Sequence, residues 1–168
     1  MKIDIRKAAP EDVRALSRVI NETWRSDYRE FLSETDLAAF TSEQRRNESF
    51  LRLFESGADI FCVMVDGEIS GVCTSVKAEE SWLSDYCEIM QLYILPEHQR
   101  IGLGRKLLSY TLRAMRKKGY KYAYLWVIQE NTKGRSFYEK FGFEANGIVQ
   151  QAEGFSKPVN AERYSIEL

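Results

Sequence analysis

The sequence has 168 residues and carries 24 Lys and Arg against 25 Asp and Glu, a formal net charge of −1. A chain so balanced has no global positive field that would draw it to nucleic acid or to an anionic membrane, so any anion site must be local. With 44% hydrophobic residues, a chain of this length buries a substantial core, and we expect residues 1–168 to form a single domain.

No stretch of the sequence predicts export or membrane insertion. The start, MKIDIRKAAPEDV, lacks an uninterrupted apolar segment, and no later run approaches the ~18 apolar residues of a membrane span. We therefore expect a cytoplasmic protein. The three cysteines, Cys62, Cys73 and Cys87, form no CxxC pair and are accompanied by one histidine, His98. We expect them to be reduced and buried, and we expect no metal site.

The first third of the chain predicts a strand followed by helices. Residues 2–8 alternate as an edge strand, and residues 10–24 place apolar side chains at helical spacing after a proline and two acids. A second helix is predicted over residues 41–57, opened by a capping box from Thr41 to Gln44 and closed by a glycine. The aromatic segment between these helices is predicted to be partly helical.

The segment DIFCVMVDGEISGVCTSVKA predicts an antiparallel hairpin. Asp66-Gly67 between β-branched runs is the preferred chemistry of a two-residue hairpin turn. A regular hairpin with this turn places Cys62 opposite Gly71 rather than Cys73. This register argues against a disulfide.

The rest of the chain alternates strands with helices. The predicted order is strand 86–95, ended by Pro96, then helix 103–118, strand 120–128, helix 132–142, and strands 143–149 and 162–168. A strand, a helix and a second strand parallel to the first form a crossover unit, so the sheet is predicted to be mixed.

The stretch HQRIGLGRKLL places two glycines directly before the helix that starts at Leu103. A helix N-terminus offers free N–H groups and a partial positive charge, and Gly102 and Gly104 leave it open to a phosphate. Arg105 and Lys106 add positive charge there. The pattern is neither a Walker loop nor a dinucleotide fingerprint, which needs a third glycine. The competing interpretation is a tight turn with solvated arginines.

Two motifs resemble those of the GNAT superfamily of N-acetyltransferases. QRIGLG, residues 99–104, fits the signature Q/R-x-x-G-x-G/A, and NTKGRSFYEKFGF, residues 131–143, resembles N-x-x-A-x-x-F-Y-x-K-x-G-F. The resemblance covers nearly the whole chain and is strongest over residues 88–143. Gly134 departs from it, because the family has alanine there; a helical glycine costs about 1 kcal/mol relative to alanine, which predicts a looser helix.

The resemblance implies a fold, a cosubstrate and a binding site. The fold is α/β of the α+β type, with a mixed, mostly antiparallel sheet of about seven strands and helices on both faces. The cosubstrate is acetyl-CoA, whose acetyl carbonyl and pantetheine arm would meet backbone N–H groups of Leu92 and Ile94 on a splayed strand. The residues that the resemblance assigns to the cofactor are Leu92, Tyr93, Ile94, Gln99, Arg100, Ile101, Gly102, Leu103, Gly104, Arg105 and Asn131.

Two residues match positions that carry acid–base chemistry in members of the family. Glu88 resembles a general base for the acceptor amine, and strand parity places it on the side of Met90, where burial would raise its pKa. The alternative is a carboxylate paired with an arginine. Tyr138 resembles the general acid that protonates the departing thiolate, and the alternative is a packing aromatic. Asn131 is also expected to cap the helix that begins at Thr132.

The acceptor is the least defined part of the prediction. Aromatic residues alternate with carboxylates in ETWRSDYREFLSE and AEESWLSDY, a composition that suits a cationic amine but also a solvated acidic face. We expect a small-molecule amine, with a protein N-terminus or a lysine side chain as the alternative. A non-catalytic acyl-CoA-binding module needs neither Glu88 nor Tyr138. The sequence leaves the oligomeric state open, a homodimer included. The carboxylates in question are Glu22, Asp27, Glu30, Glu79, Glu80 and Asp85.

Overall fold

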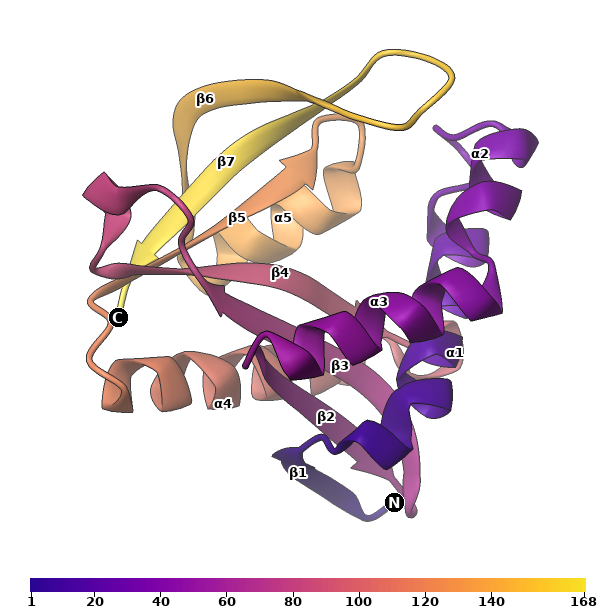
Figure 1. The fold of residues 1–168 in the computed structure, drawn as a ribbon, viewed down its shortest axis with the longest axis horizontal. Helices are drawn as coiled ribbons and strands as arrows, with labels where there is room; N and C mark the ends of the chain where they lie inside the picture. The colour runs from indigo at the N-terminus through magenta and orange to yellow at the C-terminus, as the bar shows by residue number, and fades with distance from the viewer.

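The computed structural model describes residues 1–168 and contains one seven-stranded sheet in the order β1-β2-β3-β4-β5-β7-β6. Only β4 and β5 pair in parallel, and all other neighbours are antiparallel, so the predicted mixed sheet is confirmed (Figure 1). The strands are β1 (Ile3–Lys7), β2 (Asp59–Val65), β3 (Glu68–Lys77), β4 (Tyr86–Ile94), β5 (Tyr122–Ile128), β6 (Glu144–Ala152) and β7 (Val159–Glu167).

Helices cover both faces of the sheet, as predicted. On one face α1 packs on β3, β4 and α3, and on the other α4 packs on β2, β3 and β4, with α5 behind β5 and β7 (Figure 1). None of the helices is long and apolar enough to cross a bilayer. The helices are α1 (Val13–Asp27), α2 (Glu34–Phe40), α3 (Glu43–Glu55), α4 (Leu103–Lys117) and α5 (Thr132–Phe141).

Each face has its own apolar core. The core under α1 and α3 includes Leu16, Ile20, Phe50, Ile60 and Val72. The core under α4 and α5 includes Leu107, Met115, Leu125, Phe143 and Tyr164. Both consist of side chains at helical or alternating spacing, which is why the sequence pattern located these elements.

The start of α3 differs from the prediction. The helix is capped by Ser42, whose hydroxyl accepts from the N–H of Arg45 at 3.4 Å, and not by Thr41. The hydroxyl of Thr41 instead donates to the carbonyl of Leu37 at 2.6 Å, at the C-terminal end of α2. The segment between α1 and α3, predicted to be partly helical, thus contains the separate helix α2. Thr41, the predicted N-cap of α3, lies at the C-terminal end of α2 instead.

The hairpin forms at Asp66-Gly67, but its predicted register is wrong. A bulge between Val63 and Met64 leaves Ser70 of β3 without an opposite residue, so Cys62 pairs with Val72 instead of Gly71. The three cysteines are all free and buried.

On the side of α1 and α3, no helix lies over β5, β6 and β7 (Figure 1). This uncovered part of the sheet is bridged at one end, because Asp36 of α2 accepts from the N–H of Ser156 at 3.0 Å and from its hydroxyl at 2.8 Å. Ser156 lies in the loop between β6 and β7. The contact ties that loop to the helical layer.

Candidate active site

The β4 and β5 strands separate in the middle of the sheet. They pair only at Tyr86–Tyr122, Cys87–Ala123 and Glu88–Tyr124. The N–H of Leu95 donates to the carbonyl of Ser70 on β3 at 2.8 Å. Because N–H groups alternate in direction along a strand, those of Leu92 and Ile94 point away from β3, toward the side that β5 has left. These are the two amides that the resemblance assigns to the cofactor.

Side chains replace β5 at the end of β4. The carbonyl of Ile94 accepts from the Thr23 hydroxyl at 3.1 Å and from Nε2 of Gln99 at 3.0 Å. Gln99 also donates to Asp27 at 2.9 Å, and its Oε1 accepts from Lys133 at 2.6 Å. Gln99 therefore joins β4, the end of α1 and the start of α5, a structural role that its motif position alone does not reveal.

The loop before α4 is shaped by two left-handed residues. Arg100 has φ +63° and Gly102 has φ +86°, and Gly102 is the N-cap of α4. A positive φ is unusual for arginine, and no sequence motif predicted it. A Cβ at Gly102 would meet no atom within 4 Å, so this glycine faces open space. The first-turn N–H groups of α4 are therefore accessible to an anion.

The other predicted loop residues occupy distinct environments. A Cβ at Gly104 would lie 3.5 Å from the Phe137 ring and 3.7 Å from Ile94, which are ordinary van der Waals distances, so this position faces α5 and β4. Leu103 is buried in the core, whereas Ile101 is exposed. Arg105 is exposed and lies over the Phe141 ring at 5.2 Å.

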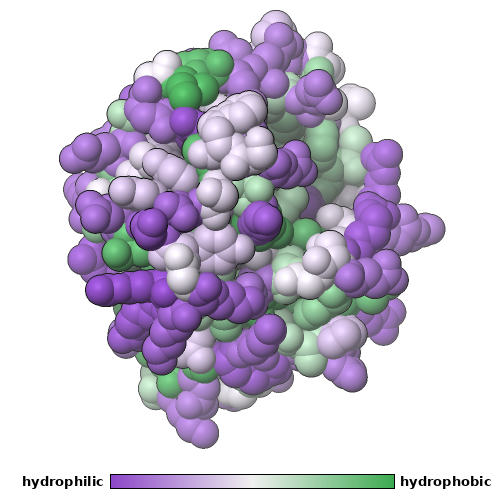
Figure 2. Space-filling view, turned by 60° about the vertical axis from the view of Figure 1, so that its left-hand side comes forward, coloured by the Kyte–Doolittle hydropathy of each residue, from purple (hydrophilic) through white to green (hydrophobic).

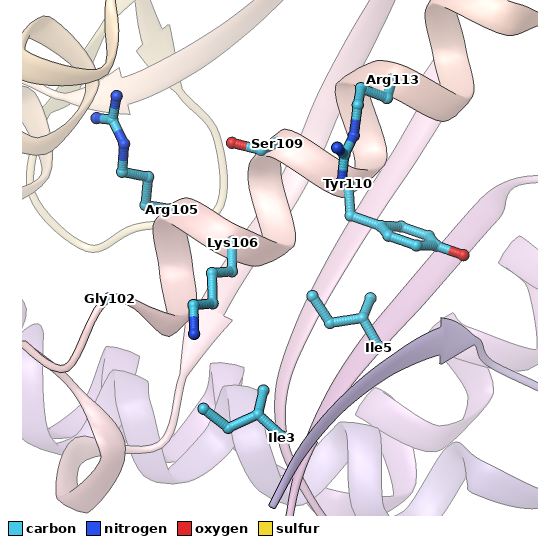
Figure 3. A pocket seen from close by; sticks show the side chains of 8 residues that line it. All are labelled: Ile3, Ile5, Gly102, Arg105, Lys106, Ser109, Tyr110 and Arg113. Atoms are coloured by element: carbon cyan, nitrogen blue, oxygen red, sulfur yellow. The ribbon is translucent and has the colours of Figure 1, made fainter.

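A positively charged groove continues from this loop along α4. Its volume is about 690 Å³, and it lies between α4 and the edge strand β1. Figure 3 shows Lys106 and Tyr110 directed from α4 toward Ile3 and Ile5, with Arg105 pointing away from them. Ser109, Tyr110 and Arg113 also line the groove. The loop motif did not predict them, because they follow it along α4.

Glu88 is the last residue of β4 that pairs with β5. It is half-buried and accepts a hydrogen bond from the Tyr124 hydroxyl at 3.2 Å. Burial raises the pKa of Glu88, as predicted; the Tyr124 hydrogen bond lowers it, and the nearby carboxylates of Glu79 and Glu80 raise it further. The alternative partner, an arginine, is absent, because the partner is a tyrosine.

A bulge at Met90 changes the face on which Glu88 lies. Thr74 pairs with Gln91 and Ser75 pairs with Ile89, so Met90 has no opposite residue. Strict alternation of side chains along the strand predicted that Glu88 lies on the same face of the sheet as Met90, Leu92 and Ile94. The bulge places it instead on the face of Gln91 and Tyr93, toward α1.

Tyr138 lies on the opposite face, on α5. Its ring packs against Phe137 and Phe143 with centroid distances of 5.2 and 5.7 Å, and its hydroxyl makes no hydrogen bond. Burial raises the pKa of this phenol strongly, and the Tyr93 phenol adds to the effect. Tyr93 in turn lies with its hydroxyl 3.4 Å from that of Tyr28 on α1. Tyr138 thus stays protonated at neutral pH.

Asn131 caps α5, as predicted. Its side-chain oxygen accepts from the N–H of Gly134 at 2.9 Å. A Cβ on residue 134 would lie 2.7 Å from Nδ2 of Asn131. An alanine at this position would therefore require the Asn131 side chain to shift.

The uncovered side of the sheet is visibly hollowed. Figure 2 shows a recess in its upper right part, lined by apolar and weakly polar side chains and bordered by hydrophilic ones. Trp82 and Met90, two exposed apolar side chains, lie on the segments that precede and follow Glu88. No group of three or more His, Cys, Asp or Glu side chains is arranged to hold a metal ion.

Residues 18–143 match the model of the acetyltransferase (GNAT) family. The chain belongs to this family. The spermidine N(1)-acetyltransferase of Thermoplasma acidophilum is 28% identical over 144 residues, which cover 86% of this chain and 89% of the relative. The GNAT fold, acetyl transfer and the use of acetyl-CoA are therefore properties of this chain.

Solved structures share the fold of this chain. The PaiA N-acetyltransferase of Thermoplasma acidophilum, in complex with coenzyme A, superposes with a TM-score of 0.79 at 25% identity and 100% coverage of both chains. The YncA acetyltransferase of Salmonella typhimurium, with acetyl-CoA, gives 0.77 at 18% identity and covers 99% of this chain and 94% of its own.

The raised pKa of Glu88 predicts a pH-dependent effect on stability. A carboxyl whose pKa is raised on folding stabilises the fold only while it is protonated, and this contribution is lost as the pH rises from its unfolded pKa through its folded pKa. Glu88→Gln should therefore increase the free energy of unfolding at pH 7.5 and leave it nearly unchanged at pH 4. Urea denaturation at both pH values measures this. The exposed Glu153→Gln is the control, and an equal gain at both pH values in Glu88→Gln would contradict the desolvation argument.

Proposed function

We propose that the enzyme transfers the acetyl group of acetyl-CoA to a primary amine of a small molecule by direct attack on the thioester. The observation that carries the proposal is the gap between β4 and β5, with Glu88 beside it on one face and Tyr138 on the other. The gap lets an acceptor on the α1 side meet a thioester that comes from the α4 side. A protein that only binds acyl-CoA would need neither Glu88 nor Tyr138 at the gap between β4 and β5.

Glu88 has the properties of a general base. A primary amine with a pKa of ~10.4 requires about 4.6 kcal/mol for deprotonation at pH 7, and a carboxylate with a raised pKa is a better proton acceptor. Glu88 takes the ammonium proton, directly or through water. The nitrogen then attacks the carbonyl carbon.

The other two groups stabilise charge on the thioester. The N–H groups of Leu92 and Ile94 donate to the carbonyl oxygen as negative charge develops on it. When the C–S bond breaks, the Tyr138 hydroxyl donates its proton to the sulfur and is reprotonated from solvent. The products are an N-acetyl amine and free coenzyme A.

The loop and the groove along α4 suit the charged end of the cosubstrate. The left-handed turn at Arg100 and Gly102 exposes the amides of the first helical turn for a pyrophosphate. Arg105 and Lys106 add charge, and the family resemblance assigns Asn131 to the pantetheine arm. The groove supplies further cations for the 3′-phosphate.

The acceptor class rests on charge and on one relative. Glu79 and Glu80 lie close enough to Glu88 to raise its pKa, which favours a cationic acceptor, and the relative cited above is named for spermidine. Thiol release from acetyl-CoA with polyamines, amino acids, aminoglycosides and short peptides tests the proposal. Turnover of peptides alone would replace the small molecule with a protein N-terminus or lysine, and turnover of none would leave only a binding module.

Coenzyme A and acetyl-CoA should raise the melting temperature of the enzyme, whereas ATP and NAD should not, because ligands that bind only the folded state stabilise it. Gly102→Asn should weaken coenzyme A binding at least about tenfold. Asparagine tolerates the left-handed backbone, so the loop keeps its shape while a side chain enters the anion site. Isothermal titration measures the affinity.

The matched control is Gly57→Asn. Gly57 has φ +79° and equally open surroundings, but it follows α3, far from the loop in the chain. Unchanged coenzyme A affinity in Gly102→Asn would show that the loop is only a turn.

Tyr138→Phe should leave the affinity for acetyl-CoA nearly intact and lower kcat at least about tenfold, because general acid catalysis contributes typically 10²–10⁴-fold. The ring contacts with Phe137 and Phe143 are kept, and only the proton donor is lost. An acyl donor with a more acidic thiol should suffer less from the substitution. Steady-state rates with both donors measure this, and equal losses would make Tyr138 a packing residue.

A further inference from the structure

Arg163 on β7 lies over two aromatic rings of β5, on the sheet face that carries Glu88. Its guanidinium carbon is 5.6 Å from the centre of the Tyr124 ring and 5.9 Å from that of Trp126. Trp126 pairs directly with Arg163 across the strands, and Tyr124 pairs with Glu88. The cation and the proposed base therefore share the uncovered side of the sheet, with the Tyr124 ring between them.

The guanidinium is held in place by one nitrogen. When the Asn146 amide is oriented so that both its oxygen and its nitrogen have a partner, the oxygen accepts from Nε of Arg163 at 2.9 Å. The nitrogen then donates to the backbone carbonyl of Arg163 at 3.1 Å. Asn146 lies where the register of β6 against β7 shifts, between Ala145 and Val149. This contact and the two rings leave both terminal nitrogens of Arg163 without a hydrogen bond or a carboxylate partner.

Arg163 is unusual among the half-buried arginines of the chain. Arg6 binds both carboxylate oxygens of Asp12 at 2.7 and 2.9 Å. Arg46 donates to the carbonyl of Phe40 at 2.8 Å, and Arg135 to the carbonyl of Gln129 at 3.2 Å. Each of these three has a terminal nitrogen bound within the protein, whereas the terminal nitrogens of Arg163 are free.

From this geometry we infer that Arg163 binds an anionic group of the acceptor, so that the preferred acceptor is an amino acid or another small amine that carries a carboxylate. The inference rests on the proposed function and names the substrate class of the same site. A planar guanidinium with two free terminal nitrogens matches a carboxylate in a bidentate pair. Its position over the Tyr124 and Trp126 rings and its Nε contact with Asn146 restrict the guanidinium in advance, which reduces the entropy lost on binding.

The charges around Tyr124 are arranged for a substrate with two unlike ends. Glu88, accompanied by Glu79 and Glu80, faces the amine end, and Arg163 faces the other. A second ammonium at that end would be repelled by the guanidinium. An amine with no anionic group leaves Arg163 without a partner.

The test compares each amino acid with the amine that lacks its carboxylate. Wild-type enzyme is assayed by thiol release at saturating acetyl-CoA with L-ornithine and putrescine, L-lysine and cadaverine, and L-phenylalanine and phenethylamine. In at least one pair the amino acid should have a KM at least about tenfold lower at similar kcat, as expected for a charge-assisted bidentate contact. Arg163→Gln should raise the KM of that amino acid to the level of its amine and leave kcat within about threefold.

Three further variants separate charge, geometry and folding. Arg163→Lys should restore only part of the preference, because lysine lacks the planar fork. Asn146→Ala should weaken the preference less than Arg163→Gln does. Arg52→Gln removes one exposed positive charge from α3 and should change neither constant. An acetyl-CoA-induced rise in melting temperature shows that each variant is folded.

The outcomes distinguish this inference from the proposed function. Turnover of both members of every pair with equal KM, or an unchanged preference in Arg163→Gln, overturns the role of Arg163 and leaves the acetyltransferase proposal intact. A consistent preference for the diamines overturns the role of Arg163 in the same way. Absence of turnover with every small amine overturns both.

Discussion

The separation of β4 from β5 after three residue pairs is the constraint on which the rest of the site depends. A strand inside a sheet that loses its neighbour exposes N–H and carbonyl groups that must find other partners. Here the carbonyl of Ile94 is taken by Thr23 and Gln99, while the N–H groups of Leu92 and Ile94 face the gap. The sheet thereby offers donors at a fixed place, which is what a thioester carbonyl needs when negative charge develops on it.

The same separation brings together groups from opposite faces of the sheet. Glu88 lies on the face of α1, where we propose that the acceptor enters the uncovered recess, and Tyr138 lies on the face of α4 and α5, beside the loop that we propose binds the pyrophosphate. Their environments differ accordingly: carboxylates and a phenol hydroxyl surround Glu88, whereas aromatic rings surround Tyr138. The raised pKa makes the Glu88 carboxylate a stronger base. The raised pKa of Tyr138 keeps the phenol protonated before the reaction but also makes it a weaker acid.

Sequence reasoning recovered what is encoded locally. Asp66-Gly67 specifies its turn through backbone preference, and the spacing of apolar residues locates the helices. Asn131 caps α5 by accepting a hydrogen bond from a residue only three positions further along the chain. Two of the failures share one cause. The bulges at Ser70 and Met90 depend on how two strands pack between two helical layers, and they shifted the partner of Cys62 and the face of Glu88. The position of Arg163 over the Tyr124 and Trp126 rings is equally non-local, because it requires β5, β6 and β7 in register.

The central claim, that Glu88 removes the proton of the acceptor amine at the gap, is tested most directly by the pH dependence of kcat in wild type and Glu88→Gln. Thiol release is followed from pH 5 to pH 10 with an amine that the enzyme accepts. We expect the variant to be slowest relative to wild type between the pKa of Glu88 and that of the amine, and the two rates to converge as the amine loses its proton to solvent at high pH. A ratio that stays constant across this range would contradict a base and make Glu88 a residue that only positions the acceptor.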